Sequence, residues 1–166
     1  MTDFDDFHNR IPKRLIAATF AASLLFDLIP FPAALSFWLP EMTALSLLYW
    51  GLNRPQSVGL FTAFACGLFL DTGIALPLGQ HALAYVLMVF FIQKYQRRII
   101  LQSYAFQAVA VFIALTGSQL TLLIIRLISE HRLIGLSGLL APVAGALAWP
   151  MLNKLMLAVL NLYRRR

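Results

Sequence analysis

Long apolar stretches alternate with short polar segments along the whole chain. After a polar leader at residues 1–12, the apolar stretches cover approximately residues 13–29, 40–53, 57–76, 80–93, 104–128 and 135–162. A helix rises about 1.5 Å per residue, so about 20 apolar residues cross the roughly 30 Å hydrocarbon core of a bilayer. The pattern therefore predicts an all-α fold, a polytopic bundle of six transmembrane helices that forms one integral membrane domain over residues 1–166.

Prolines and tryptophans mark the ends of the first two stretches. Pro30 and Pro32 end the first helix, because proline lacks the amide donor and clashes with the preceding turn. The apolar part of the second stretch, residues 42–52, is only about 16 Å long at 1.5 Å per residue, so it needs its flanks to cross a membrane. Trp38 and Trp50 are placed to mark the two interfaces of this helix.

The composition supports a membrane protein and excludes other classes. Hydrophobic residues make up 60% of the chain and charged residues 12%, with a mean hydropathy of +0.78. Soluble domains carry about 25% charged residues, so a soluble enzyme and a disordered chain are excluded. The single cysteine, Cys66, excludes a disulfide within the chain and a cysteine metal cluster.

The positive charges indicate the orientation of the bundle rather than a nucleic-acid partner. The net charge is +6, but the basic residues lie in short groups between apolar stretches and not on one polar face. With six crossings, 11 basic residues fall on the side of the termini: Arg10, Lys13, Arg14, Arg54, Lys94, Arg97, Arg98, Lys154, Arg164, Arg165 and Arg166. Arg126 and Arg132 fall on the other side, so the positive-inside rule predicts both termini in the cytoplasm. Lys94, Arg97 and Arg98 are expected in a loop.

Three charged residues lie within or near the ends of the predicted spans. They are Asp27, Asp71 and Arg126, and all three fall toward the outer side of the membrane. A charge in this position is costly unless it is paired or reaches the interface. We expect either that an acidic residue pairs with Arg126, which would hold helices together or hold a partner, or that these side chains extend to the interface.

Small residues recur every four positions in the third stretch. Gly59, Ala63, Gly67 and Asp71 fall on one face of a helix there. Small residues let helix backbones approach closely, which is how helices associate in lipid. The pattern predicts a packing helix that contacts either another helix of this chain or a partner protein, and a second such ridge is formed by Ser137, Ala141 and Gly145.

Patterns typical of catalytic or metal sites do not occur in the sequence. His8, His81 and His131 lack a second histidine at helical ligand spacing, and no GxSxG motif, Walker motif or glycine-rich phosphate loop is found. No cofactor and no enzymatic activity are expected. A lipid-modifying enzyme stays open as a third class, because Asp71 and His81 lie close in sequence across a turn.

The middle of the chain, roughly residues 28–98, resembles the MreD family of rod shape-determining proteins. The residues that carry the resemblance are Pro30, Pro32, Pro40, Leu48, Tyr49, Trp50, Arg54, Pro55, Gly67, Leu70, Asp71, Leu78, Gly79, His81, Ala82 and Leu83, with a weaker continuation in Lys94, Tyr95 and Gln96. Many members of the family have glycine where this chain has Ala75, so a less tight turn is expected after Asp71.

The resemblance implies a non-enzymatic component of the bacterial cell-wall elongation complex in the inner membrane. Its implied partners are MreC, the glycosyltransferase RodA and a penicillin-binding transpeptidase, either directly or through MreC, with MreB contacted indirectly. The family is also similar in fold to the substrate-binding subunits of energy-coupling-factor vitamin transporters. A vitamin-type transporter subunit is therefore the alternative function, although Thr116, Ser118, Gln119 and Asn153 are too scattered to indicate a ligand cavity.

Two surfaces are candidates for contact with other molecules. The segment 31–41 carries Phe37 and Trp38 between prolines and is expected to offer an aromatic surface to a partner, with Trp50 as a further candidate. Arg54, Lys94, Arg97, Arg98 and the terminal arginines are expected either to set topology alone or to contact anionic lipid or an acidic partner.

Overall fold

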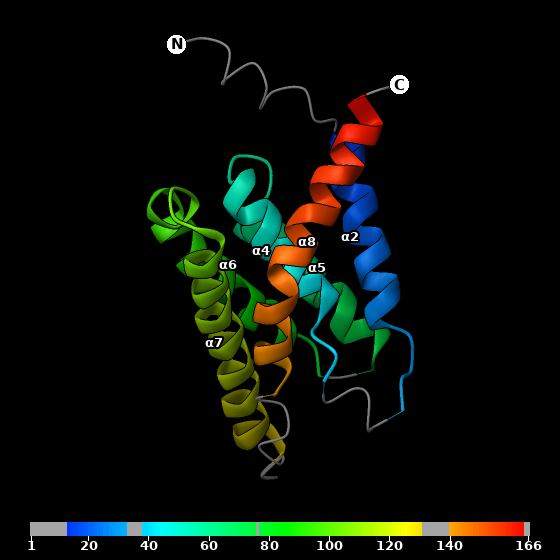
Figure 1. The fold of residues 1–166 in the computed structure, drawn as a ribbon. Helices are drawn as coiled ribbons and strands as arrows, with labels where there is room; N and C mark the ends of the chain where they lie inside the picture. The colour runs from blue at the N-terminus through cyan, green and yellow to red at the C-terminus, as the bar shows by residue number, and fades with distance from the viewer. Residues whose placement is uncertain (1–12, 33–37, 76, 131–139, 165–166) are drawn as a thin grey trace.

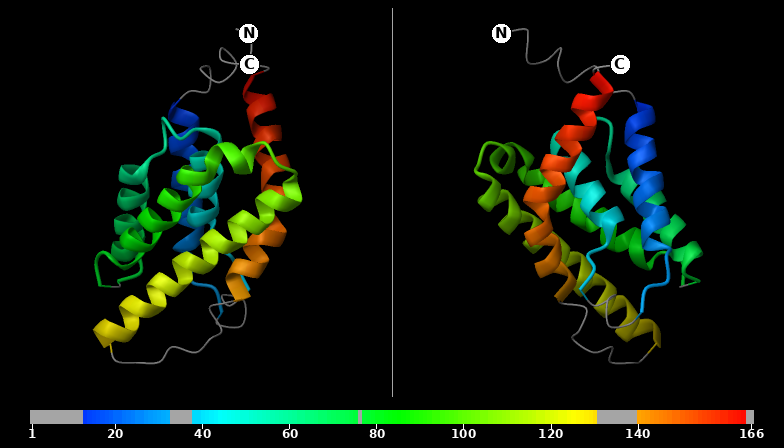
Figure 2. Two further views of the ribbon diagram at one scale, coloured as in Figure 1. Left: turned by 90° about the vertical axis from the view of Figure 1, so that its left-hand side faces the viewer. Right: turned by 45° about the vertical axis from the view of Figure 1, so that its right-hand side comes forward.

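Six α-helices form a bundle in the computed structural model, which describes residues 13–32, 38–75, 77–130 and 140–164. The helices are α2 (Lys13–Asp27), α4 (Met42–Asn53), α5 (Leu60–Gly73), α6 (Gln80–Ile100), α7 (Tyr104–Glu130) and α8 (Leu140–Arg164), and the described ranges contain no strand. Successive helices run in opposite directions, so α2 begins and α8 ends at the same end of the bundle (Figures 1 and 2). We call this end the termini end and the opposite one the far end.

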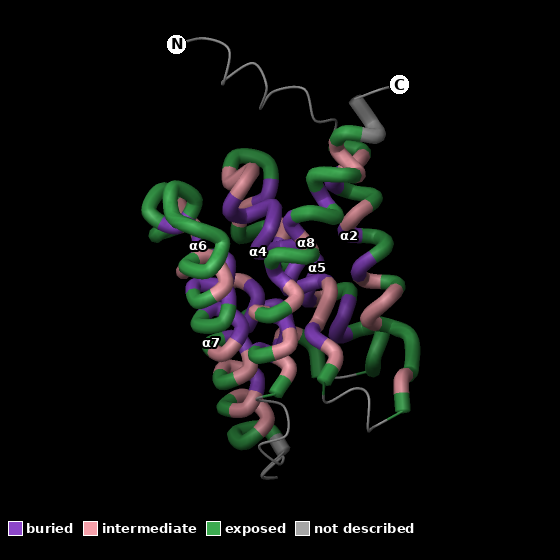
Figure 3. The backbone as a smooth tube through the Cα atoms, viewed as in Figure 1, coloured by how far each residue is buried: buried purple, intermediate pink, exposed green. Residues whose placement is uncertain are grey.

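Helix α4 lies at the centre of the bundle. Every residue from Thr43 to Leu52 is buried, and α4 contacts α2, α6 and α8. Helix α5 packs against α6 and α2, whereas α7 packs between α6 and α8. Figure 3 shows the buried backbone concentrated on α4 and on the faces that surround it. Helix α4 has only 12 residues, but the neighbouring helices cover its apolar side chains, so α4 does not need the length of a helix that faces lipid.

An aromatic group joins α2, α4 and α8 inside the bundle. Trp50 is 1% exposed, and its Nε1 donates a 2.8 Å hydrogen bond to Thr19 Oγ1 on α2. The ring of Tyr49 lies edge-on to Trp50 at 5.2 Å and 6.4 Å from the ring of Trp149 on α8. Trp50 was expected at an interface and on a partner surface. The structure instead buries it, because its indole N–H finds a partner within the protein.

Much of the outer surface of the bundle is apolar. Phe61 is 84% exposed, Leu147 75% and Met151 76%, on α5 and α8. Soluble monomers seldom expose large apolar areas of this kind, so the exterior is suited to lipid. Within the described residues, α7 and α8 are long and apolar enough to cross a membrane, and α5 is apolar but shorter.

Helix α6 extends further than the sequence pattern predicted. The expected loop with Lys94, Arg97 and Arg98 is wrong, since all three lie on α6, which ends at Ile100. Two glutamines fix this extension: Gln93 Nε2 donates to the carbonyl of Val58 at 2.7 Å, and Gln96 Nε2 to that of Leu52 at 2.6 Å. Basic side chains in the last turn also interact favourably with the helix dipole.

Candidate functional site

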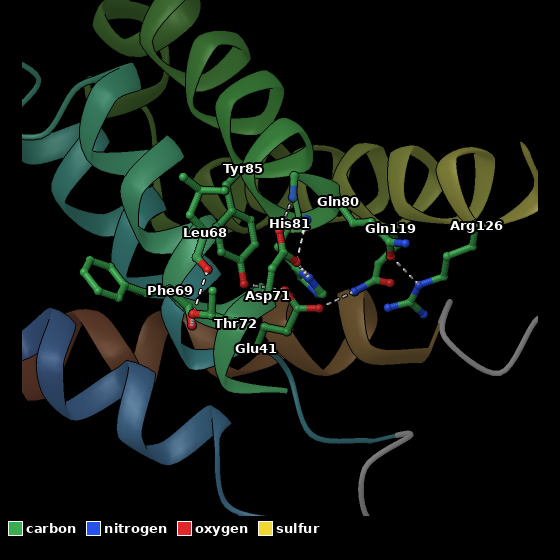
Figure 4. Close-up of polar contacts among 11 residues, drawn as sticks. Glu41, Leu68, Phe69, Asp71, Thr72, Gln80, His81, Tyr85, Gln119 and Arg126 are labelled. Atoms are coloured by element: carbon green, nitrogen blue, oxygen red, sulfur yellow. Dashed lines mark hydrogen bonds and ion pairs between the residues drawn. The ribbon is translucent and has the colours of Figure 1, made fainter. Parts of the chain in front are cut away.

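Polar side chains from four helices and from Glu41, the residue before α4, meet inside the far end of the bundle. This polar cluster consists of Asp27, Glu41, Asp71, Gln80, His81, Tyr85, Gln119 and Arg126. Figure 4 labels all of these residues except Asp27. Asp71, Gln80, His81 and Tyr85 are at most 3% exposed. Buried polar groups are costly unless they are hydrogen-bonded, so the cluster is the principal candidate for a functional or structural site.

Asp71 and His81 form the centre of the polar cluster. Asp71 Oδ1 lies 2.7 Å from His81 Nδ1 and accepts the His81 backbone N–H at 3.1 Å, while Oδ2 accepts the backbone N–H of Gly79 at 2.8 Å. The carboxylate of α5 therefore holds the first turn of α6 in place. The same carboxylate holds the His81 ring in one orientation through Nδ1.

The turn between α5 and α6 requires two residues with positive φ. Gly79 has a φ of 100° and Ala75 a φ of 54°. Glycine adopts such angles without steric cost, but for an L-residue the left-handed conformation costs about 1–2 kcal/mol. Ala75 is the position where the resemblance suggested glycine, so this chain keeps a glycine-type conformation with an alanine side chain.

Ala75→Gly is expected to stabilise the protein by about 1 kcal/mol, because it removes the strain at this position. Equilibrium unfolding in mixed micelles measures the change. Ala65→Gly on α5 serves as the control and is expected to destabilise by about 1 kcal/mol, since its backbone is helical. A loss of stability in Ala75→Gly would contradict the assignment of strain.

Glu41 connects three helices just before α4 begins. Its Oε2 accepts the Tyr85 hydroxyl of α6 at 2.8 Å, and its Oε1 accepts Gln119 Nε2 of α7 at 3.0 Å. Asp27, at the last position of α2, accepts the backbone N–H groups of Met42 and Thr43 at 2.9 and 2.8 Å. Asp27 thus caps the N-terminus of α4, which Glu41 at the N-cap position does not do.

Arg126 contacts an amide rather than an acid. Its Nε donates to Gln80 Oε1 at 3.3 Å. An ion pair between Arg126 and an acidic residue was one of two alternatives, and none is present among the described residues, where Asp71 pairs with His81 instead. Asp71 pairs with His81 because His81 lies in the first turn of α6, which directly follows the turn after α5, whereas Arg126 lies on α7.

The small-residue ridge of α5 faces α6. Ala63, Gly67 and Asp71 are buried, and a Cβ at Gly67 would overlap the backbone of Ala82 and His81. Gly59 precedes α5 as its N-cap and has open space around it. In the second ridge, Gly145 contacts Leu115 of α7, and Ser137 lies outside the described residues.

The candidate partner surface is described only in part. Trp38 is 61% exposed, whereas Phe37 lies outside the described residues. Trp38 lies three residues before Glu41, whose side chain belongs to the polar cluster.

A cavity of about 190 Å³ adjoins the polar cluster. Its polar lining comes from Asp27, Glu41 and His81, and its apolar walls come from Phe26, Ile29, Phe31, Leu39, Leu70 and Ile74, with Pro40. Small-molecule sites occupy about 300–1,000 Å³, so this volume does not favour a vitamin-sized ligand. Among the residues that the structure describes, no three His, Cys, Asp or Glu side chains are grouped to hold a metal ion.

Comparison with known proteins gives a consistent result. A sequence model of the family described as rod shape-determining protein MreD matches residues 9–160. The chain is 26% identical over 141 residues to the rod shape-determining protein MreD of Haemophilus influenzae, which covers 85% of this chain and 87% of that protein. No solved structure matches the chain.

Proposed function

Because the chain belongs to the MreD family of rod shape-determining proteins, we propose that it is a non-enzymatic component of the bacterial cell-wall elongation complex. In this proposal the protein spans the cytoplasmic membrane, binds MreC and links MreC to RodA and a penicillin-binding transpeptidase. MreB is contacted indirectly. The observation that carries the proposal is the family match over residues 9–160.

A membrane location is supported by the apolar exterior and by the two long apolar helices. We propose six crossings with both termini in the cytoplasm. The basic residues of the described helices support this orientation, because Lys13, Arg14, Arg97, Arg98 and Arg164 lie toward the termini end. A positively charged end is typical of the cytoplasmic side.

A scaffold role is supported by the way in which the polar cluster is used. Asp27, Asp71 and Glu41 accept hydrogen bonds from other helices or from the backbone, which fixes helix positions. A rigid bundle of this kind presents a constant surface to partners. The Asp71–His81 pair lacks an adjacent nucleophile in the described residues, so the lipid-modifying alternative receives no support from it.

Purification of the tagged chain from its native membrane in mild detergent, followed by mass spectrometry, tests the proposal. We expect MreC, and with it RodA or the transpeptidase, to be recovered. Recovery of paired ATPases with a coupling subunit would instead assign the chain to a transporter and contradict the proposal.

Trp38→Ala combined with Phe37→Ala is expected to lower recovery of MreC at least tenfold, since Trp38 is exposed and an aromatic anchor at an interface contributes about 2 kcal/mol or more. Quantitative co-purification and cell shape are the measurements. Phe61→Ala, which removes a more exposed aromatic ring from α5, is the control and is expected to leave recovery unchanged. Unchanged recovery in the double variant would remove this surface from the proposal.

A further inference from the structure

The cavity at the far end is lined by hydrogen-bond acceptors. Asp27 and Glu41 contribute carboxylates, and His81 contributes a ring whose Nδ1 is already bonded to Asp71. His81 is 3% exposed, and its Nε2, the nitrogen that points away from Asp71, has no hydrogen-bond partner in the described part of the chain. Each carboxylate oxygen can accept more than one hydrogen bond, so the cavity is suited to a group that donates hydrogen bonds.

The carboxylates that border the cavity receive only neutral donors. Asp27 accepts two backbone amides, and Glu41 accepts a phenol and a side-chain amide. Within the described residues neither carboxylate forms an ion pair with a lysine or arginine. Each carboxylate oxygen has a further lone pair available, so both can accept another donor. The cavity therefore offers two carboxylates that have no lysine or arginine partner among the described residues, which favours a cation.

The surroundings of the cavity decide what kind of cation fits. The side chains are not grouped as a metal site among the described residues, so a metal ion is disfavoured. A zwitterionic lipid headgroup would bring a phosphate, and no lysine or arginine of the described residues lines the cavity to hold it. The apolar walls of Phe26, Ile29 and Leu70 suit the methylene stem of a lysine or arginine side chain.

We propose that this cavity is a binding site for the ammonium or guanidinium group of a lysine or arginine side chain from a partner protein. The cationic group contacts Asp27 and Glu41, while the stem lies along the apolar wall. The exposed side chains of Ile29 and Ile74 place the mouth of the cavity at the protein surface, where a partner segment can enter. This inference rests on the proposed function only in assuming a protein partner.

Binding of two small probes to the purified full-length chain tests the inference. N-acetyl-arginine amide carries the guanidinium group, and N-acetyl-citrulline amide has the same shape without the charge. We expect the arginine probe to raise the thermal midpoint in a saturable way and the citrulline probe to bind at least about tenfold more weakly, since a charged donor is lost. Equal responses to the two probes would overturn the inference.

Two variants locate the binding site. Glu41→Gln and Asp27→Asn are each expected to weaken the arginine probe about tenfold. Thr121→Ala, which removes only a hydroxyl bonded within α7, is the control and should bind as the parent does. An unchanged response in both folded acidic variants would overturn the assignment. If neither variant folds, the comparison of the two probes on the parent chain still decides.

A lipid source is distinguished in nanodiscs. Stabilisation of the chain by phosphatidylethanolamine relative to phosphatidylcholine alone, with competition against the arginine probe, would assign the cavity to a lipid amine and overturn the protein side-chain assignment. We expect no such competition. Because these arms use the isolated chain, their failure leaves the recovery of MreC untouched, so failure of this inference and failure of the proposed function are distinguishable.

Discussion

Asp71→Ala is expected to destabilise the protein by about 3–5 kcal/mol, the range measured when one partner of a buried pair is removed. Asp71 is fully buried and accepts three hydrogen bonds. The substitution leaves the amides of Gly79 and His81 and the His81 ring without their acceptor. The free energy of unfolding in mixed micelles measures the change.

The neighbouring residue provides a matched control. Thr72 is exposed, and its hydroxyl bonds only to carbonyls of its own helix, so Thr72→Ala is expected to change stability by less than about 0.5 kcal/mol. A double-mutant cycle with His81→Ala separates the side-chain pair from the backbone amides, because only the pair contributes to the coupling energy. Additive effects of Asp71→Ala and His81→Ala would contradict the contact described here.

The helical bundle could be predicted largely from the hydropathy pattern. Pro30 and Pro32 follow α2, and the polar turn at Arg54 and Pro55 separates α4 from α5, as expected from the chemistry of proline. The end of α6 could not be predicted in this way. Its polar last turns are held by hydrogen bonds from Gln93 and Gln96 to a turn about 40 residues earlier, and hydropathy contains no information on such contacts.

The polar cluster could be predicted only in part. Asp71 and His81 are close in sequence, so the sequence predicted that they lie near each other. It did not decide between this contact and an ion pair of an acidic residue with Arg126. Glu41 and Tyr85 were missed, and Gln119 was set aside as too scattered, because the three residues lie far apart in the chain. The two hydrogen bonds of Glu41 join residues separated by 44 and 78 positions. One signal was present: Glu41 is an acidic residue at the start of an apolar stretch, where a buried charge is costly.

Trp50 illustrates the same limit at a single residue. Tryptophan is enriched both at membrane interfaces and in cores where its N–H has a partner. The choice between the two depends on Thr19, 31 residues earlier on α2. The sequence alone does not show that Trp50 and Thr19 form a hydrogen bond, so Trp50 was assigned to the interface.

Gly67→Ala is expected to destabilise the protein by about 3 kcal/mol or more, or to prevent its accumulation in the membrane. A Cβ at this position would overlap backbone atoms of Ala82 and His81, and a backbone cannot move aside as a flexible side chain can. Overpacking generally costs about 1–3 kcal/mol even where side chains can adjust. Membrane levels and the free energy of unfolding are the measurements.

Gly117→Ala on α7 is the matched control, since nothing lies within 4 Å of its added Cβ. It is expected to be neutral or to stabilise by about 0.5–1 kcal/mol, because alanine favours the helix. The overlap at Gly67 also displaces the first turn of α6, which carries His81 away from Asp71. Asp71→Ala should therefore cost less in the Gly67→Ala background than in the parent, and equal costs in the two backgrounds would show that the helix contact and the polar cluster act independently.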